Sequence, residues 1–202
     1  MTPKQRSQQG TGAPRPDNLR LRLRRETSAL SQDLDRVQRI PDLSGVAGLS
    51  QFLMVQRIMM GILARHRVGT LSREIIPDLA QRAKGDLITL GARVPLHANT
   101  LNDELADVHG SAVDYVVLGA RVRMDILERK WRASTVPEVR LARAFMSAPE
   151  DFTLWRTCVL HLQRHRATGP EADRIVSDAH KIFAAFGVVV HGIVLHEAAT
   201  PR

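Results

Sequence analysis

The chain has 202 residues and a formal net charge of +8, which comes mainly from arginine. A chain of this length suits one domain with a sizeable hydrophobic core. Hydrophobic residues make up 44% of the sequence and charged residues 25%, proportions typical of a soluble globular protein. The single cysteine, Cys158, excludes an intramolecular disulfide and suits a reducing compartment. We therefore expect a cytoplasmic, single-domain protein that does not span a membrane.

The positive charge raises the question of nucleic-acid binding. The arginines are spread over every predicted helix instead of forming one block. Aromatic side chains, on which unpaired bases stack, make up only 4% of the chain. The composition therefore argues against nucleic acid as a partner.

Apolar residues recur at three- and four-residue steps along most of the chain, which predicts amphipathic helices. We expect a disordered tail over residues 1–18, which are rich in polar and turn-forming residues, and a flexible end over 197–202. The predicted helices cover approximately residues 19–39, 49–66, 72–90, 101–132, 137–147, 149–168 and 171–190.

Glycine and proline mark the places where these helices stop or weaken. Pro77 lies inside the third predicted helix, and Gly110 and Gly119 are weak points in the fourth. The alternation of apolar and polar residues that would indicate a strand is missing from the sequence. The prediction is an all-α fold with six to eight helices in one domain over residues 19–196.

The periodicity also predicts which side of each helix is buried. In the first helix the predicted inward residues are Leu23, Thr27, Leu30, Leu34 and Val37. In the second helix they are Phe52, Leu53, Met59, Met60 and Leu63. In the helix that follows Pro149 they are Phe152, Trp155, Val159 and Leu162. In the last helix they are Ile175, Ala179, Ile182 and Phe186.

Two segments carry a motif. Residues 23–34 read Leu-Arg-Arg-Glu-Thr-Ser-Ala-Leu-Ser-Gln-Asp-Leu, and residues 115–124 read Tyr-Val-Val-Leu-Gly-Ala-Arg-Val-Arg-Met. In sequence and in separation they resemble the two helices that sandwich haem in the haem oxygenase family. The order and spacing of the predicted helices match that family over residues 19–187. The resemblance implies a haem-oxygenase-like helical bundle.

Both motifs differ from the family where its chemistry takes place. The family's first helix reads roughly Leu-Arg-x-x-Thr-x-x-x-His-x-x-Leu, and the histidine is the axial ligand of the haem iron. Ser31 stands at that position here. The second helix of bacterial members resembles Leu-Tyr-Val-Leu-Glu-Gly-Ser-x-Leu-Gly-Gly. The chain keeps Tyr115 and Gly119, continues with Ala120, and has Arg123 and Met124 in place of the Gly-Gly pair.

These differences change what the two helices can do. A serine hydroxyl is a poor ligand for ferrous iron, for which histidine is the usual proximal residue. Glycine allows a helix to approach the porphyrin because it has no Cβ, whereas Arg123 and Met124 carry long side chains. They must either turn outward or fill the space between the helices. The close packing of native interiors favours a filled cavity, but both alternatives stay open.

Basic side chains hold the haem propionates in the family, and the resemblance assigns Arg24 and Lys181 as contacts for an anionic group. A simple surface charge is the alternative at both positions. Arg20, Arg22, Arg24 and Arg25 form the densest basic group of the chain. Three interpretations of this group stay open: a phosphate site, a propionate site, or the solvated side of a helix.

A second constellation combines Cys158, His161 and His165, which follow one another at helical spacing. Closed metal sites usually need four ligands, and the sequence shows no second ligand pair at a suitable spacing. We therefore predict no metal site. Phosphate-binding loops, nucleophile elbows and zinc-protease motifs are also missing from the sequence.

The sequence predicts a haem-oxygenase-like protein that has lost ordinary haem cleavage and acts by binding, in a regulatory role. The bound molecule would be a protein partner, haem or another tetrapyrrole held in a different way, or another small ligand. The alternative is an active haem oxygenase that converts haem to biliverdin, CO and iron. That alternative needs a substitute axial ligand among eight histidines, none of which lies on the first helix.

The end of the chain provides a separate hypothesis about partners. Residues 188–195 are apolar apart from His191 and Gly192. Such a segment needs burial, either on its own domain or against another chain. Extra core on the same chain and a homodimer or docking surface are both compatible with this pattern.

Overall fold

The computed structural model of the protein describes residues 18–39, 41–93, 100–149 and 152–198. The side chains of residues 100, 102 and 194–198 are not among the described parts. The predicted disordered tail, except for Asn18, and residues 199–202 of the predicted flexible end lie outside the described residues.

The described residues form helices and no strand, which confirms the all-α prediction. Seven helices have eight residues or more, as the sequence predicted, and two short helices of five residues join them. In chain order they are α1 (Leu19–Gln38), α2 (Val46–Arg65), α3 (Ile75–Thr89), α4 (Thr100–Glu104), α5 (Gly110–Arg121), α6 (Asp125–Arg132), α7 (Pro137–Leu141), α8 (Phe152–Arg164) and α9 (Pro170–Ala198).

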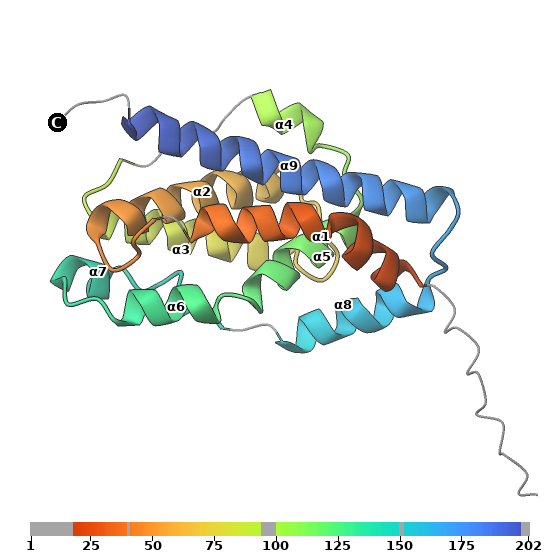
Figure 1. The fold of residues 1–202 in the computed structure, drawn as a ribbon, viewed down its shortest axis with the longest axis horizontal. Helices are drawn as coiled ribbons and strands as arrows, with labels where there is room; N and C mark the ends of the chain where they lie inside the picture. Colours follow the sequence, from red (N-terminus) through yellow and green to blue (C-terminus); the bar gives the residue numbers. More distant parts are fainter. Residues whose placement is uncertain (1–17, 40, 94–99, 150–151, 199–202) are drawn as a thin grey trace, which may run out of the picture.

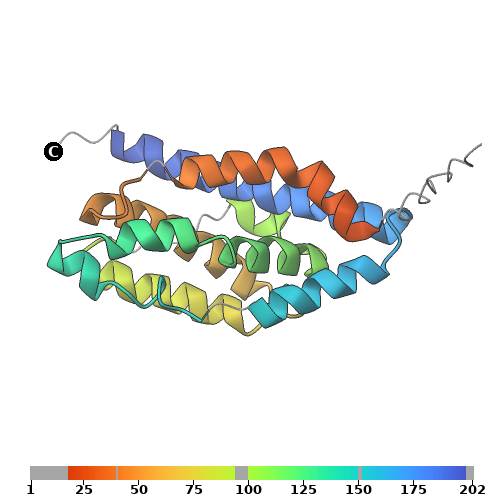
Figure 2. The same cartoon turned by 60° about the horizontal axis from the view of Figure 1, so that its bottom comes forward.

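Helices α1 and α9 lie side by side and run in the same direction (Figures 1 and 2). The N-terminal end of α1 is joined both to the segment that follows α8 and to the start of α9. The backbone N–H of Leu19 donates to the carbonyl of His165 at 3.1 Å, and Arg22 Nη1 lies 2.6 Å from Asp173 Oδ1. The Asp173 and Glu26 carboxylates raise the pKa of the Arg22 guanidinium by accepting hydrogen bonds from it. This ion-pair group holds the start of α1 to the start of α9.

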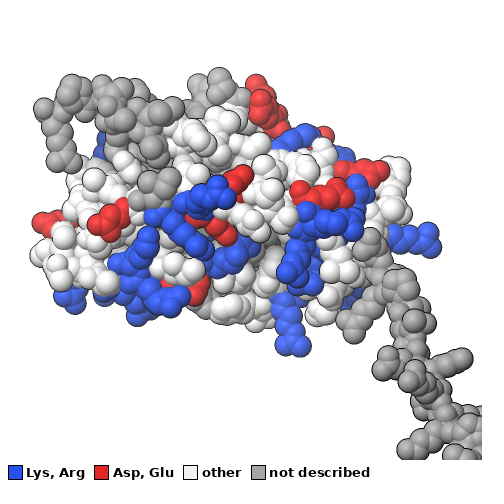
Figure 3. All heavy atoms as spheres, viewed as in Figure 1, with Lys and Arg blue, Asp and Glu red and all other residues white. Residues whose placement is uncertain are grey.

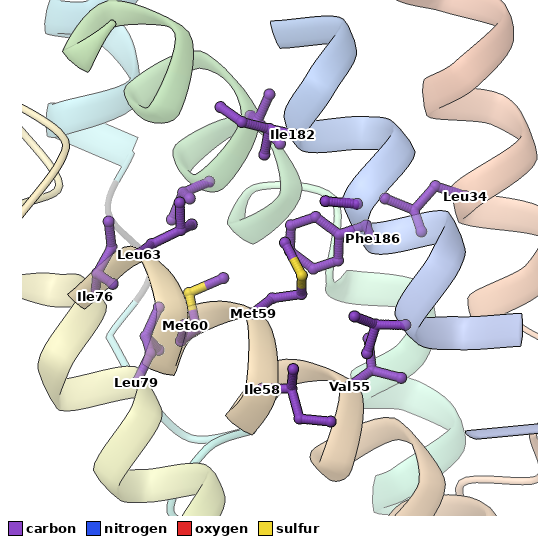
Figure 4. Packing of buried hydrophobic residues seen from close by; sticks show 14 of the residues in the cluster. Leu34, Val55, Ile58, Met59, Met60, Leu63, Ile76, Leu79, Ile182 and Phe186 are labelled. Carbon is purple, nitrogen blue, oxygen red and sulfur yellow. The ribbon is translucent and has the colours of Figure 1, made fainter. Parts of the chain in front are cut away.

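Helix α2 is the centre of the hydrophobic core. It packs against α3 and α9, and twelve of its 20 residues are buried. Figure 4 shows its side chains meeting those of α1, α3 and α9 in a common interior, with Met59 and Phe186 among them. The predicted inward residues of this helix, Phe52, Leu53, Met59, Met60 and Leu63, are all buried, which confirms the prediction.

By length and composition alone, α2 is apolar enough to cross a membrane, and it is the only such helix among the described residues. Within its most apolar window, 67% of the residues are buried inside the bundle. The burial of α2 between α3 and α9 accounts for its apolar composition, because a helix that is covered on most sides needs apolar residues on most sides.

The predicted helix over residues 101–132 is divided into α4, α5 and α6. The second interruption does not fall at Gly119, which lies inside α5, but at residues 122–124. There the backbone N–H groups of Arg123 and Met124 donate to the carbonyls three residues earlier, at 3.1 and 3.2 Å. This tighter pattern ends α5, and Asp125 then begins α6. The turn that results carries Arg123.

Two predicted inward residues are in fact exposed. Leu30 of α1 is 36% exposed and Phe152 of α8 is 54% exposed. Helix α8 packs against α1 and α5, so only a narrow stripe of it, Cys158 and Leu162, is fully buried. The inward residues predicted for the last helix are all buried.

The apolar segment near the C-terminus continues α9 and does not follow it. Val189 and Val190 are buried, and Ile193 packs against the core, whereas Val188 is 59% exposed. The side chains of the remaining apolar residues, 194 and 195, lie outside the described part of the structure. The described half of this segment therefore belongs to the core of its own chain.

Three buried aspartates fasten the loops to the helices. The carboxylate of Asp114 accepts hydrogen bonds from the backbone N–H groups of residues 70–72 and from the Ser72 hydroxyl. Asp86 accepts from the N–H groups of residues 144 and 145. Asp178 accepts from the N–H of His109, just before α5. Burial raises the pKa of Asp86, although its two backbone donors act in the opposite direction.

Replacing Val190 by Ala tests whether the C-terminal segment belongs to the core. The change removes two buried methyl groups, so we expect a loss of about 2 kcal/mol in the free energy of unfolding. Val188→Ala, two residues away on the exposed side, is the matched control and should change stability little. Guanidinium denaturation measures both. Equal effects of the two variants would contradict the burial of Val190.

Candidate functional site

Helices α1, α5 and α8 enclose an open pocket of about 320 Å³. Seven of its lining residues come from α1, and one each comes from α5, the α5–α6 turn and α8. They are Arg20, Arg24, Thr27, Ser28, Ser31, Gln32, Asp35, Tyr115, Arg123 and Trp155. The pocket thus lies where the two motif helices face each other. Its volume is at the lower end of the range for small-molecule sites, roughly 300–1,000 Å³.

Helix α1 supplies most of this wall because its polar and apolar residues lie on different sides. Leu19, Leu23 and Leu34 are buried in the bundle, and the pocket residues recur at three- and four-residue steps on the adjacent side. Thr27 lies at the border between the two sides. Its hydroxyl donates to the carbonyl of Leu23 at 2.8 Å, and its Oγ1 lies 3.5 Å from the Tyr115 hydroxyl oxygen.

Arg123 reaches from the α5–α6 turn to α1. Its Nη2 donates a hydrogen bond to Ser31 Oγ at 3.2 Å, and its Nε lies 3.5 Å from Asp35 Oδ2. The side chains of Arg123 and Asp35 keep 41% and 31% of their exposure, and such half-exposed ion pairs contribute roughly 0–1 kcal/mol. Of the two alternatives that the sequence left open, Arg123 therefore takes up space between the motif helices, held by weak contacts.

Gly119 lets an aromatic side chain lie close to α5. A Cβ at this position would come within 3.3 Å of two ring carbons of Trp155 and within 3.4 Å of Arg123 Nη1. The Trp155 ring also contacts Tyr115, with ring centroids 5.9 Å apart. The indole of Trp155 therefore makes the close approach to α5 that Gly119 allows.

Ala120 and Met124 lie on another side of the structure. Both line a small cavity of about 20 Å³ in the interior, together with core residues such as Leu34 and Phe186. Met124 is partly buried against the hydrophobic core. Although it follows Arg123 directly, it fills space in the core and not in the pocket, because successive residues of a helical turn point to different sides.

The two basic residues that the resemblance assigned to an anionic group, Arg24 and Lys181, differ in their position relative to the pocket. Arg24 lines the pocket. Lys181 of α9 does not, because its Nζ donates to Oδ1 of the buried Asp178 at 2.8 Å. The structure therefore brings Ser31, Tyr115, Arg123 and Arg24 together around one pocket and leaves Lys181 outside it.

Sequence reasoning missed four residues of the pocket: Ser28, Gln32, Asp35 and Trp155. Ser28 and Asp35 had a signal, since they lie four residues after Arg24 and Ser31 on the same helix face. Trp155 had none, because α8 reaches the pocket only through the tertiary fold.

The lining does not fit ordinary ligation of a haem iron. The oxygen of Ser31 already accepts a hydrogen bond from Arg123, and none of the ten lining residues is a histidine, cysteine or methionine. The one phenol, Tyr115, directs its hydroxyl toward Thr27. The described histidines lie outside this lining. His97 and the side chain of His196 are not among the described parts of the structure.

Cys158, His161 and Asp114 line a separate small pocket of about 110 Å³, together with Thr70, Leu71, Ser111 and Thr157. The rings of His161 and His165 are 4.4 Å apart between centroids. Among the described residues there is no group of three or more His, Cys, Asp or Glu arranged to hold a metal ion. Burial raises the pKa of the Cys158 thiol to about 12, and the charge of Asp114 adds to this effect. Cys158 is therefore a protonated core residue and no nucleophile at neutral pH.

Comparisons with known proteins add no assignment. No family model matches the chain, and no curated protein matches it in sequence. The site is therefore interpreted from its own geometry.

The environment of Cys158 predicts slow reaction with thiol reagents. A thiol whose pKa is raised to about 12 stays protonated at pH 8, and its side chain is also buried. Ellman's reagent should therefore react only after unfolding in guanidinium. A Cys158→Ala variant that carries Thr153→Cys, on the exposed side of α8, is the control and should react at once. Rapid reaction of Cys158 in the folded protein would contradict the burial.

Proposed function

We propose that the protein is a degenerate haem-oxygenase-like protein that lacks ordinary haem cleavage and acts by binding a small ligand, in a regulatory role. The ligand site is the pocket between α1 and α5. One observation carries this proposal: Arg123 is hydrogen-bonded to Ser31, the residue at the position that the resemblance assigns to the axial histidine. The contact fills the place of the iron ligand and leaves a polar pocket beside it.

The contacts of the C-terminal segment favour a small ligand over a protein partner as the bound molecule. Of the apolar residues that suggested a homodimer or a docking surface, Val189 and Val190 are buried in the core of the same chain, and Ile193 packs against it. The pocket, in contrast, is open and lined by charged and aromatic side chains. Few, well-placed polar groups beside aromatic rings are typical of sites that fix the orientation of a small ligand.

The alternative of an active haem oxygenase requires a substitute axial ligand near the pocket. Among the described histidines, His180 places a ring nitrogen beside α1: its Nε2 is 3.1 Å from the carbonyl oxygen of Glu26. Glu26 and His180 are both outside the pocket lining. This position supplies no ligand on the pocket side of α1 and so supports the binding function.

Titration with haemin, followed by reduction under oxygen, tests the loss of cleavage. We expect no sharp Soret band of the kind given by histidine-ligated haem, and no verdohaem or biliverdin, because the pocket offers no axial ligand. A haem protein with a proximal histidine serves as the positive control. Formation of verdohaem by the unmodified protein would overturn the proposal.

Variants at Ser31 and Arg123 test whether these two residues block the site. Ser31→His alone should bind haemin weakly, because Arg123 still crosses the pocket. The double variant Ser31→His with Arg123→Gly should bind at least about tenfold more tightly, which corresponds to roughly 1.4 kcal/mol. Spectroscopic titration of the Soret band measures both affinities.

Met124→Gly, added to the double variant, is the control for removing any long side chain from the α5–α6 turn. Because Met124 packs against the core, this change should lower the stability by ~1 kcal/mol or more without improving haemin binding. Equal and tight haemin binding by the unmodified protein and the double variant would show that Arg123 blocks nothing.

A further inference from the structure

The pocket carries an excess of positive charge. Its lining contains three guanidinium groups, from Arg20, Arg24 and Arg123, and a single carboxylate, from Asp35. Only Arg123 is paired with that carboxylate. Within the described part of the chain, Arg20 and Arg24 make no ion pair. Figure 3 shows basic side chains gathered in two groups on the face that carries α1, with fewer acidic side chains beside them.

The position of these arginines on α1 favours an anion nearby. The first turn of α1 contains no acidic residue, although the positive end of the helix dipole favours acidic groups there. Arg20 and Arg24 are also four residues apart, a spacing at which like charges repel. Arg22, by contrast, has its acidic partner Glu26 at that spacing, with 2.9 Å between Nε and Oε1.

One wall of the same pocket is aromatic. Trp155 and Tyr115 are both half-buried and contact each other, with ring planes inclined by 42°. Hydroxyl groups of Ser28 and Ser31 and the amide of Gln32 complete the lining near the arginines. A flat ring can pack against the indole, while an anionic substituent on it meets the guanidinium groups, which bind carboxylate and phosphate oxygens in pairs.

We infer that the α1–α5 pocket binds a small organic anion that carries a flat ring, with Arg20, Arg24 and Arg123 as its charge partners. This inference rests on the proposed function and names the class of ligand for the same site. The ring lies against Trp155. The anionic group replaces Asp35 as the partner of Arg123, because the contact between Arg123 and Asp35 is long and half-exposed. Asp35 is therefore a competitor that the ligand displaces.

The test is isothermal titration calorimetry on the full chain with three probes of similar size. Phenyl phosphate and benzoate each carry a ring and an anionic group, and they separate a phosphate preference from a carboxylate preference. Benzyl alcohol carries the ring without charge. We expect saturable binding of at least one of the two anions and none of benzyl alcohol.

Variants assign the binding to the pocket. Arg24→Gln and Arg123→Gln should each weaken the binding of the preferred anion about tenfold, because each removes a charge-assisted hydrogen-bond donor. Arg25→Gln is the matched control, since Arg25 follows Arg24 on α1 but does not line the pocket. Asp35→Asn should tighten binding, because it removes the competitor for Arg123. A gain of affinity cannot result from misfolding, and thermal melting checks that the other variants fold.

Three outcomes would overturn the inference: no heat of binding with either anion, equal affinity for benzyl alcohol, or equal losses in Arg24→Gln and Arg25→Gln. None of these measurements uses haem. A negative result therefore rejects the inferred class of ligand and does not affect the proposed loss of haem cleavage. Verdohaem formation in the haemin experiment would instead remove the proposed function, whatever the anions do.

Discussion

The carboxylate of Asp114 is the interaction on which the rest of the candidate site depends. It is 3% exposed, and it accepts hydrogen bonds from three successive backbone N–H groups, at residues 70–72, and from the Ser72 hydroxyl. A buried carboxylate is tolerated only when its oxygens are satisfied in this way. The contact fixes α5 against the loop between α2 and α3. Tyr115, the next residue along, is thereby fixed at the pocket wall.

The two ends of α5 are fixed by different means. Asp178 of α9 accepts the N–H of His109 at 2.9 Å, and the His109 side chain in turn accepts the N–H of Ser111. At the other end, the turn at residues 122–124 changes the direction of the chain. This turn separates two adjacent side chains, so that Arg123 reaches α1 and Met124 enters the core. The polar pocket and the hydrophobic core therefore meet at one turn.

The same positions that resemble a haem site are used here for different contacts. Ser31 accepts a hydrogen bond from Arg123, and Gly119 makes room for Trp155. Each of these contacts brings a side chain into the space between α1, α5 and α8. The contacts are also mutually consistent, since Arg123 Nη1 and the Trp155 ring both lie next to Gly119. The contacts of Ser31, Gly119 and Arg123 thus belong to one polar pocket between α1, α5 and α8.

The sequence by itself determined the elements whose burial follows a simple period. The inward residues of α2 and α9 were predicted correctly because these helices are covered over a broad face, which must be mostly apolar. This result depends only on the period along one helix. The grouping of Ser31, Tyr115, Arg123 and Arg24, which lie on α1, on α5 and on the α5–α6 turn, came instead from the resemblance of the two motifs to a pair of facing helices.

The tertiary structure alone decided the remaining features. The helix break at residues 122–124, the exposure of Phe152 and the capture of Lys181 by Asp178 all depend on what packs against each helix. Trp155 reaches the pocket for the same reason, as it is separated from Tyr115 by 40 residues in the chain and comes close through the packing of α8 on α5. A period along one helix indicates which side is apolar, but it does not indicate which other segment will cover that side.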